Sequence, residues 1–206
     1  DGNTVISANE YDVKYKDADG HEVSVTKNAG SYTLEITNKE GADYAFSGKT
    51  TANYTIKQKA LTVMAKAKAI SYGSEASNNG VEYSGFAEGE SETTEGVFSG
   101  TLSYAYNSKE DGTGDAYTTS SPVGTYYIIP SGLMSGNYAI TYNAGVLTVS
   151  DKVVVIGGEG DVDADATISV SPTEFTYNGK DQKPEVKITL KDGNTVIFAN
   201  EYDVNR

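Results

Sequence analysis

Thirteen residues at one end of the chain recur almost unchanged near the other. Residues 1–13 read DGNTVISANEYDV and residues 192–204 read DGNTVIFANEYDV, so that only Ser7 and Phe198 differ. A copy displaced by 191 positions indicates a tandem array whose period is slightly shorter than this 206-residue chain. We therefore expect modules that contact their sequence neighbours, and both ends of the chain to fall inside a repeat.

Apolar side chains occupy every second position in many short segments, which is the period of a β-strand. Clear examples are residues 11–15, 32–36, 102–106, 138–142 and 186–190. Turn sequences rich in Gly, Asn and Asp separate these segments at the spacing typical of antiparallel sandwiches. The pattern predicts an all-β fold of tandem immunoglobulin-like antiparallel β-sandwiches in an elongated array.

A second, weaker repeat lies inside the first and defines the modules. Tyr32 and Tyr44 are twelve residues apart, as are Tyr126 and Tyr138, and a further strand-like segment follows each pair. We therefore expect two modules that share their last strands. Packing or a tyrosine-corner hydrogen bond explains these tyrosines better than a ligand platform does.

The two repeats together predict the domain boundaries. We expect residues 1–59 to be the C-terminal part of an Ig-like module and residues 60–150 to be one β-sandwich module. Residues 151–165 read as an acidic connector, and residues 166–206 as the N-terminal part of the next Ig-like module. Residues 166–191 joined to residues 1–59 make about 85 residues, a suitable size for one sandwich.

Composition excludes several classes of function. Cysteine is absent, which removes disulfides and thiol nucleophiles, although an internal crosslink from a buried lysine to Asn or Asp remains open. A formal net charge of -13 argues against nucleic acid as a partner. The one histidine, His21, stands in a charged turn without the positioned partner that acid–base catalysis needs. We expect no enzyme activity.

The densest acidic cluster lies in the connector and consists of Glu159, Asp161, Asp163 and Asp165. Alternating carboxylates in a flexible segment can converge on Ca²⁺, which prefers oxygen ligands. The EF-hand pattern fails, because Ala166 stands at the position of the turn glycine. Two interpretations stay open: a calcium site that stiffens the connector, and a solvated linker that keeps modules apart.

Tyr127 is the candidate ligand-binding residue. Tyr126 and Tyr127 are adjacent, so their strand must direct one ring to each face, and an outward tyrosine can stack on a sugar or anchor a partner. Residues 88–95 and 107–115 read as exposed loops of the kind that carry adhesive contacts. Spacer modules also have such loops, and the chain lacks tryptophan.

Several segments together resemble the MBG repeat of the Tyr-Gly type from large bacterial surface proteins. They are AISYG at 69–73, VEYSGF at 81–86, GVFSGTL at 96–102, PVGTY at 122–126 and GNYAI at 136–140. Residues 28–32, 175–179 and 200–204 resemble, more loosely, short Ig-like repeats of bacterial adhesins. The resemblance implies Ig-like sandwiches, an extracellular or cell-surface setting and no catalytic residues.

The features above predict a non-catalytic repeat region of a secreted or cell-surface bacterial protein that acts as an adhesin stalk or fibre spacer. The alternative is a β-sandwich module that binds a carbohydrate or host ligand, with a glycan or host surface protein as partner. We expect contacts with neighbouring repeats of the same protein. A half-sandwich also exposes unpaired edges, so head-to-tail self-association by strand complementation is a further expectation.

Overall fold

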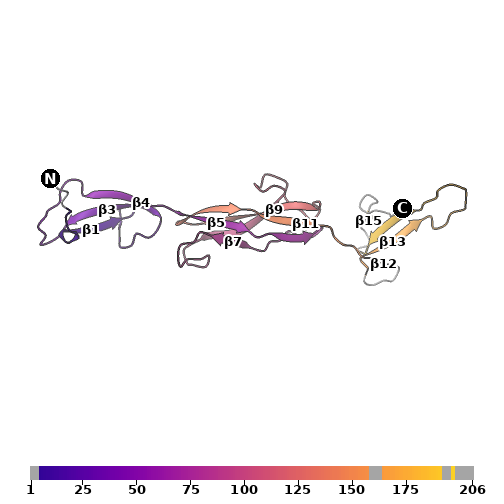
Figure 1. Ribbon diagram of the computed structural model, residues 1–206, viewed down its shortest axis with the longest axis horizontal. Coiled ribbons are helices and arrows are strands. Elements are labelled where there is room, and N and C mark those ends of the chain that lie inside the picture. The colour runs from indigo at the N-terminus through magenta and orange to yellow at the C-terminus, as the bar shows by residue number, and fades with distance from the viewer. Residues whose placement is uncertain (1–4, 158–163, 192–195, 198–206) are drawn as a thin grey trace. The chain divides into compact units, whose positions relative to one another are not determined.

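The computed structural model describes residues 5–157, 164–191 and 196–197 (Figure 1). The chain divides into two compact units, Asp1–Ser150 and Asp151–Arg206. Within the described residues the structure consists of β-strands and one short 3₁₀ turn, η1 (Ala8–Glu10), which confirms the predicted all-β class. None of the described segments forms a helix of the length and apolarity needed to cross a membrane.

The first sheet is antiparallel, with its strands in the order β2–β1–β3–β4. Its strands are β1 (Tyr11–Lys16), β2 (Glu22–Val23), β3 (Gly30–Asn38) and β4 (Thr51–Ile56). The predicted alternation at residues 11–15 and 32–36 therefore lies in β1 and β3. This sheet ends two residues before β5, the first strand of the next sheet pair.

The two faces of the first sheet differ sharply in polarity. On one face Val13 lies opposite Ile36 and Tyr15 lies opposite Leu34. On the other face Lys16 pairs with Glu35 at 2.7 Å. Tyr32 is the only buried apolar residue among described residues 5–58, so the apolar face of this sheet is largely uncovered.

Residues 59–150 form two sheets with two clusters of buried apolar residues. One sheet has the order β10–β5–β7 and the other the order β6–β11–β9–β8. Their strands are β5 (Lys59–Ala65), β6 (Lys68–Ser71), β7 (Val81–Ser84), β8 (Ser99–Asn107), β9 (Gly124–Met134), β10 (Tyr138–Asn143) and β11 (Gly145–Ser150). Ala65 on β5 packs in one buried cluster with Ile128 on β9 and with Leu147 and Val149 on β11.

Two chain segments change sheets side by side. β5 runs parallel to β10 in one sheet, and after Lys66 and Ala67 its continuation β6 runs parallel to β11 in the other. At this crossing Gly145 lies against the backbone of Ala65: a Cβ on Gly145 would stand 2.4 Å from the Ala65 carbonyl oxygen. The crossing therefore requires a residue without a side chain at position 145.

The second unit contains a sheet with the order β12–β13–β14–β15. Its strands are β12 (Ile156–Gly157), β13 (Ala166–Ser171), β14 (Glu185–Leu190) and β15 (Val196–Ile197). β13 pairs antiparallel with β14, and Ile168 lies opposite Ile188. β14 in turn pairs antiparallel with β15.

Candidate functional site

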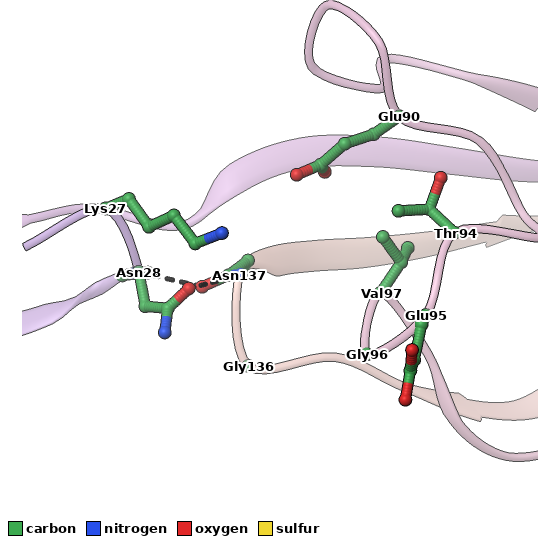
Figure 2. A pocket seen from close by; sticks show the side chains of 10 residues that line it. Lys27, Asn28, Glu90, Thr94, Glu95, Gly96, Val97, Gly136 and Asn137 are labelled. Atoms are coloured by element: carbon green, nitrogen blue, oxygen red, sulfur yellow. Dashed lines mark hydrogen bonds between the residues drawn. The ribbon is translucent and has the colours of Figure 1, made fainter. Parts of the chain in front are cut away.

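A pocket of about 490 Å³ lies where the turn before β3 meets the loops of residues 90–97 and 135–137 (Figure 2). It is lined by Lys27, Asn28, Ala29, Glu90, Thr94, Glu95, Gly96, Val97, Gly136 and Asn137. The pocket lies within the unit Asp1–Ser150. We refer to the meeting point of the turn before β3 with the loops of residues 90–97 and 135–137 as the junction.

Asn137 holds three segments together at the junction. Its side-chain Oδ1 accepts a hydrogen bond from the Ala29 N–H at 2.9 Å, and its Nδ2 donates to Asn28 Oδ1 at 3.2 Å. Its main-chain carbonyl accepts the Lys59 N–H at 2.9 Å. A single residue thus connects the turn before β3, the start of β5 and the start of β10.

Gln58 provides a second tie. β4 ends at Ile56 and β5 begins at Lys59, so only Lys57 and Gln58 connect the first sheet to the following domain. The Gln58 Nε2 donates to the carbonyls of Ser135 and Gly136 at 3.2 and 3.1 Å. The connection is only two residues long, and the hydrogen bonds of Gln58 and Asn137 hold the segments next to it. Together they restrict the bending of the chain between the first sheet and residues 59–150.

One wall of the pocket is fixed by a buried tyrosine. Tyr138 is only 3% exposed, and its hydroxyl accepts the Ala87 N–H at 2.8 Å while donating a hydrogen bond to the Glu90 carboxylate. This bond to Glu90 raises the pKa of Tyr138. Figure 2 shows Glu90 and Lys27 extending toward the same space, whereas Glu95 points away.

The hydroxyl in the pocket lining, on Thr94, accepts the Ser91 N–H. The remaining side-chain polar groups are amides, a lysine and two carboxylates, which can bind and position a chain. The arrangement at the junction fastens two parts of the chain together.

The predicted tyrosine-corner bonds are present in both parts of the unit. Tyr32 donates to the carbonyl of Asn28 and Tyr126 to that of Pro122, each at 2.9 Å and each four residues upstream. Tyr126 also packs edge-to-face on Tyr117 of the core at 5.1 Å. The second tyrosines of the two predicted pairs, Tyr44 and Tyr138, are not equivalent. Tyr44 is 50% exposed and lies outside the strands, whereas Tyr138 is buried.

Tyr127 lies in the first half of β9 and is half-buried. Its strand neighbours Tyr126 and Ile128 pack on the core, so the alternation directs Tyr127 to the outer face, as the sequence indicates. Its cross-strand partners are Asn107 on β8 and Val146 on β11. Its role as a ligand-binding residue stays a prediction.

The predicted loop at residues 107–115, which begins at the cross-strand partner of Tyr127, is held by internal hydrogen bonds. Asn107 is 9% exposed; its Nδ2 donates to the carbonyls of Gly112 and Gly114, and its Oδ1 accepts the Lys109 N–H. Asp111 accepts both the N–H and the hydroxyl of Thr113, and these bonds lower the pKa of Asp111. The loop is therefore a structured surface.

The predicted calcium site lies mostly outside the described residues, which do not include Glu159, Asp161 and Asp163. Asp165 is described, and its Oδ2 accepts the Val155 N–H at 3.0 Å while its own N–H donates to the Val155 carbonyl. This carboxylate holds the chain just before β13. The calcium site stays a prediction, and calorimetric titration with Ca²⁺ tests it.

Another group with ligand geometry is the exposed turn formed by Asp17, Asp19 and His21. Asp17 Oδ1 accepts the N–H groups of both Asp19 and His21, so this carboxylate shapes the turn. Among the described lysines none is buried, so the condition for an internal lysine crosslink is not met in that part of the chain.

The comparisons with known proteins bear on residues 59–150. Residues 61–148 match the family model of the MBG domain (YGX type). Comparison with curated proteins and with solved structures gave no match. The matched segment is the two-sheet domain described above, and the match suggests a repeat module of a surface protein.

The sequence missed the two residues that make the junction. Asn137 stands in the segment GNYAI, which carries part of the MBG resemblance, but this segment gave it no role. Gln58 stands next to a predicted boundary and has no distinctive neighbours. The sequence offered two signals, a short polar connection at residues 57–58 and an Asn just before a predicted strand. They indicated where the junction lies, but not the hydrogen-bond partners of Gln58 and Asn137.

Proposed function

We propose that this chain is a non-catalytic spacer in a secreted or cell-surface bacterial protein, where its modules hold other parts of that protein away from the cell. The MBG match at residues 61–148 supports a surface repeat module. The excess of negative charge keeps such modules soluble and apart. The function is mechanical: sheets provide stable units, and short connections transmit their orientation.

The observation that carries this proposal is the junction. A spacer needs joints that resist bending, and here a two-residue connection is reinforced by Asn137 and Gln58. Two side-chain hydrogen bonds from Asn137 contribute on the order of 1–3 kcal/mol together. Because both bonds reach the turn before β3, their loss loosens the attachment of the first sheet to residues 59–150, referred to below as the MBG-type domain.

NMR relaxation on the full chain tests the joint. We expect residues 11–56 and residues 59–150 to tumble with the same correlation time, and Asn137→Ala to make the two times diverge. Asn79→Ala is the matched control, because Asn79 donates to the Ala67 carbonyl inside the MBG-type domain. Independent tumbling in the unchanged protein, or no effect of Asn137→Ala, contradicts the proposed spacer mechanism.

The alternative function is binding of a carbohydrate or host ligand through the outer face of β9. The observation that favours it is the half-buried Tyr127 ring between Asn107 and Val146, beside a structured loop. A glycan array with the full chain tests it. Binding that Tyr127→Ala abolishes, while Tyr44→Ala leaves it intact, supports the alternative over the spacer; no binding removes it.

A further inference from the structure

A cavity of about 540 Å³ lies at the apolar face of the first sheet. It is lined by Ile6, Tyr11, Leu34, Ile36 and Phe46 together with residues of segment 47–52. Val13 and Tyr15 on the same face are 36% and 37% exposed. A sheet with one charged and one apolar face is stable when another layer covers the apolar face. Within described residues 5–58 no such layer is present.

The sheet of the second unit has the complementary need. Ile168 and Val170 on β13 lie on one face with their partners Ile188 and Val186 on β14. Ile168 is 54% exposed and Val170 39% exposed. The opposite face carries Thr167, Ser169 and their polar partners. Ile188 and Ala166 on the same face are buried, so the part of this face that is open in the described residues is the one around Ile168 and Val170.

The sequence repeat relates the segments of the two sheets to one another along the chain. Since residues 192–204 repeat residues 1–13, the segment 166–191 is the one that directly precedes the repeated sequence. Val5 and Ile6 thus correspond to Val196 and Ile197, which form β15. β15 pairs with β14, whereas Val5 and Ile6 belong to no strand and Val5 is 89% exposed.

We propose that β13 and β14 of a second copy of this chain cover the apolar face of the first sheet and pair with Val5 and Ile6. The observed pairing of β14 with β15 gives the register: Thr189 opposite Val5 and Ile188 opposite Ile6. This inference goes beyond the spacer function and does not depend on the junction.

Exchange of identical segments makes this contact inexpensive. β14 releases its own Val-Ile pair and takes up the same two residues from another copy, so the backbone hydrogen bonds lost and gained are equivalent. The apolar faces of the two sheets are then removed from water, and this burial drives association. The net charge of -13 on each copy opposes association, so added salt strengthens it.

Cysteine pairing tests the register, because the chain contains no cysteine of its own. A Val5→Cys chain is mixed with an affinity-tagged Thr189→Cys chain and oxidised. We expect a disulfide-linked heterodimer, since directly opposed residues lie within the reach of a disulfide. Thr167→Cys is the control: Thr167 lies one strand further away, opposite Thr189, which adds about 4.8 Å. No crosslink, or equal yields from both mixtures, overturns the proposal.

Light scattering with surface variants tests the faces. We expect the mass of the unchanged chain to grow with concentration, and Ile36→Lys or Val170→Lys to keep each chain monomeric. Thr37→Lys and Thr167→Lys place the same charge on the opposite faces of the same strands and should assemble normally. A mixture of Ile36→Lys and Val170→Lys should form a 1:1 dimer, which also shows that both variants are folded. A monomeric unchanged chain at every concentration, or a mixture that stays monomeric, refutes the proposal.

Discussion

Replacement of Gly145 by alanine tests the crossing between the two sheets of the MBG-type domain. The added Cβ would stand 2.4 Å from the Ala65 carbonyl oxygen, 2.8 Å from the Ala65 carbonyl carbon and 3.0 Å from the Lys66 carbonyl oxygen. All three atoms are backbone, so no side chain can rotate away. The strands on both sides of the crossing must separate by several tenths of an ångström or more to reach ordinary contact distances.

The expected cost follows from the position of these strands. β5 and β11 both contribute buried residues to the core, including Val63, Ala65 and Leu147. Forcing extra volume into such a place costs about 1–3 kcal/mol. For a domain of this size each kcal/mol lowers the melting temperature by roughly 4–8 °C. Gly145→Ala should therefore lower the melting temperature of this domain measurably.

Hydrogen exchange on the full chain locates the effect. We expect amides of β5 and β11 that exchange through global opening to exchange roughly tenfold faster for each 1.4 kcal/mol lost. Gly136→Ala is the matched control, because a Cβ there meets no atom within 4 Å. Unchanged exchange in Gly145→Ala, or an equal loss in Gly136→Ala, would refute the close-approach argument.

Three further changes probe the tyrosines and the loop. Tyr138→Phe leaves the part-buried Ala87 N–H without its acceptor and removes the hydrogen bond from the buried Tyr138 to Glu90, so it should destabilise the domain by about 1–3 kcal/mol in denaturant unfolding. Tyr126→Phe removes a more exposed corner bond and should cost about 0.5–1.5 kcal/mol in the same assay. The hydrogen bonds from Thr113 lower the pKa of Asp111 below its ordinary value of 3.8. Their contribution to the stability of the loop is therefore fully present above pH 3.8 and is lost as the pH falls through the lower pKa of the folded state. An NMR titration of the Thr113 amide should have its midpoint below pH 3.8.

Each of these expectations has a distinct contrary result. A Tyr126→Phe loss larger than that of Tyr138→Phe would contradict the burial argument, because the less exposed hydrogen bonds of Tyr138 should dominate. A Thr113 midpoint at or above the ordinary carboxyl value would show that the two bonds to Asp111 are not formed in solution.

Local alternation determined much of the secondary structure. The segments 11–15, 32–36, 102–106, 138–142 and 186–190 lie in β1, β3, β8, β10 and β14. This succeeded because the period of two is a property of the strand itself and each apolar position faces a core or an open apolar face. The tyrosine-corner bonds were equally accessible, since donor and acceptor are only four residues apart.

The tertiary structure alone decided which remote segments meet. β5 pairs in parallel with β10, and the change of sheet at Ala65 is what requires glycine at position 145. Asn137 likewise gains its role from Asn28 and Ala29, more than a hundred residues earlier. A sequence pattern reports the face on which a side chain lies, because this follows from local backbone geometry. It does not report which distant backbone approaches that face, because this depends on how all the strands together bury their apolar surface.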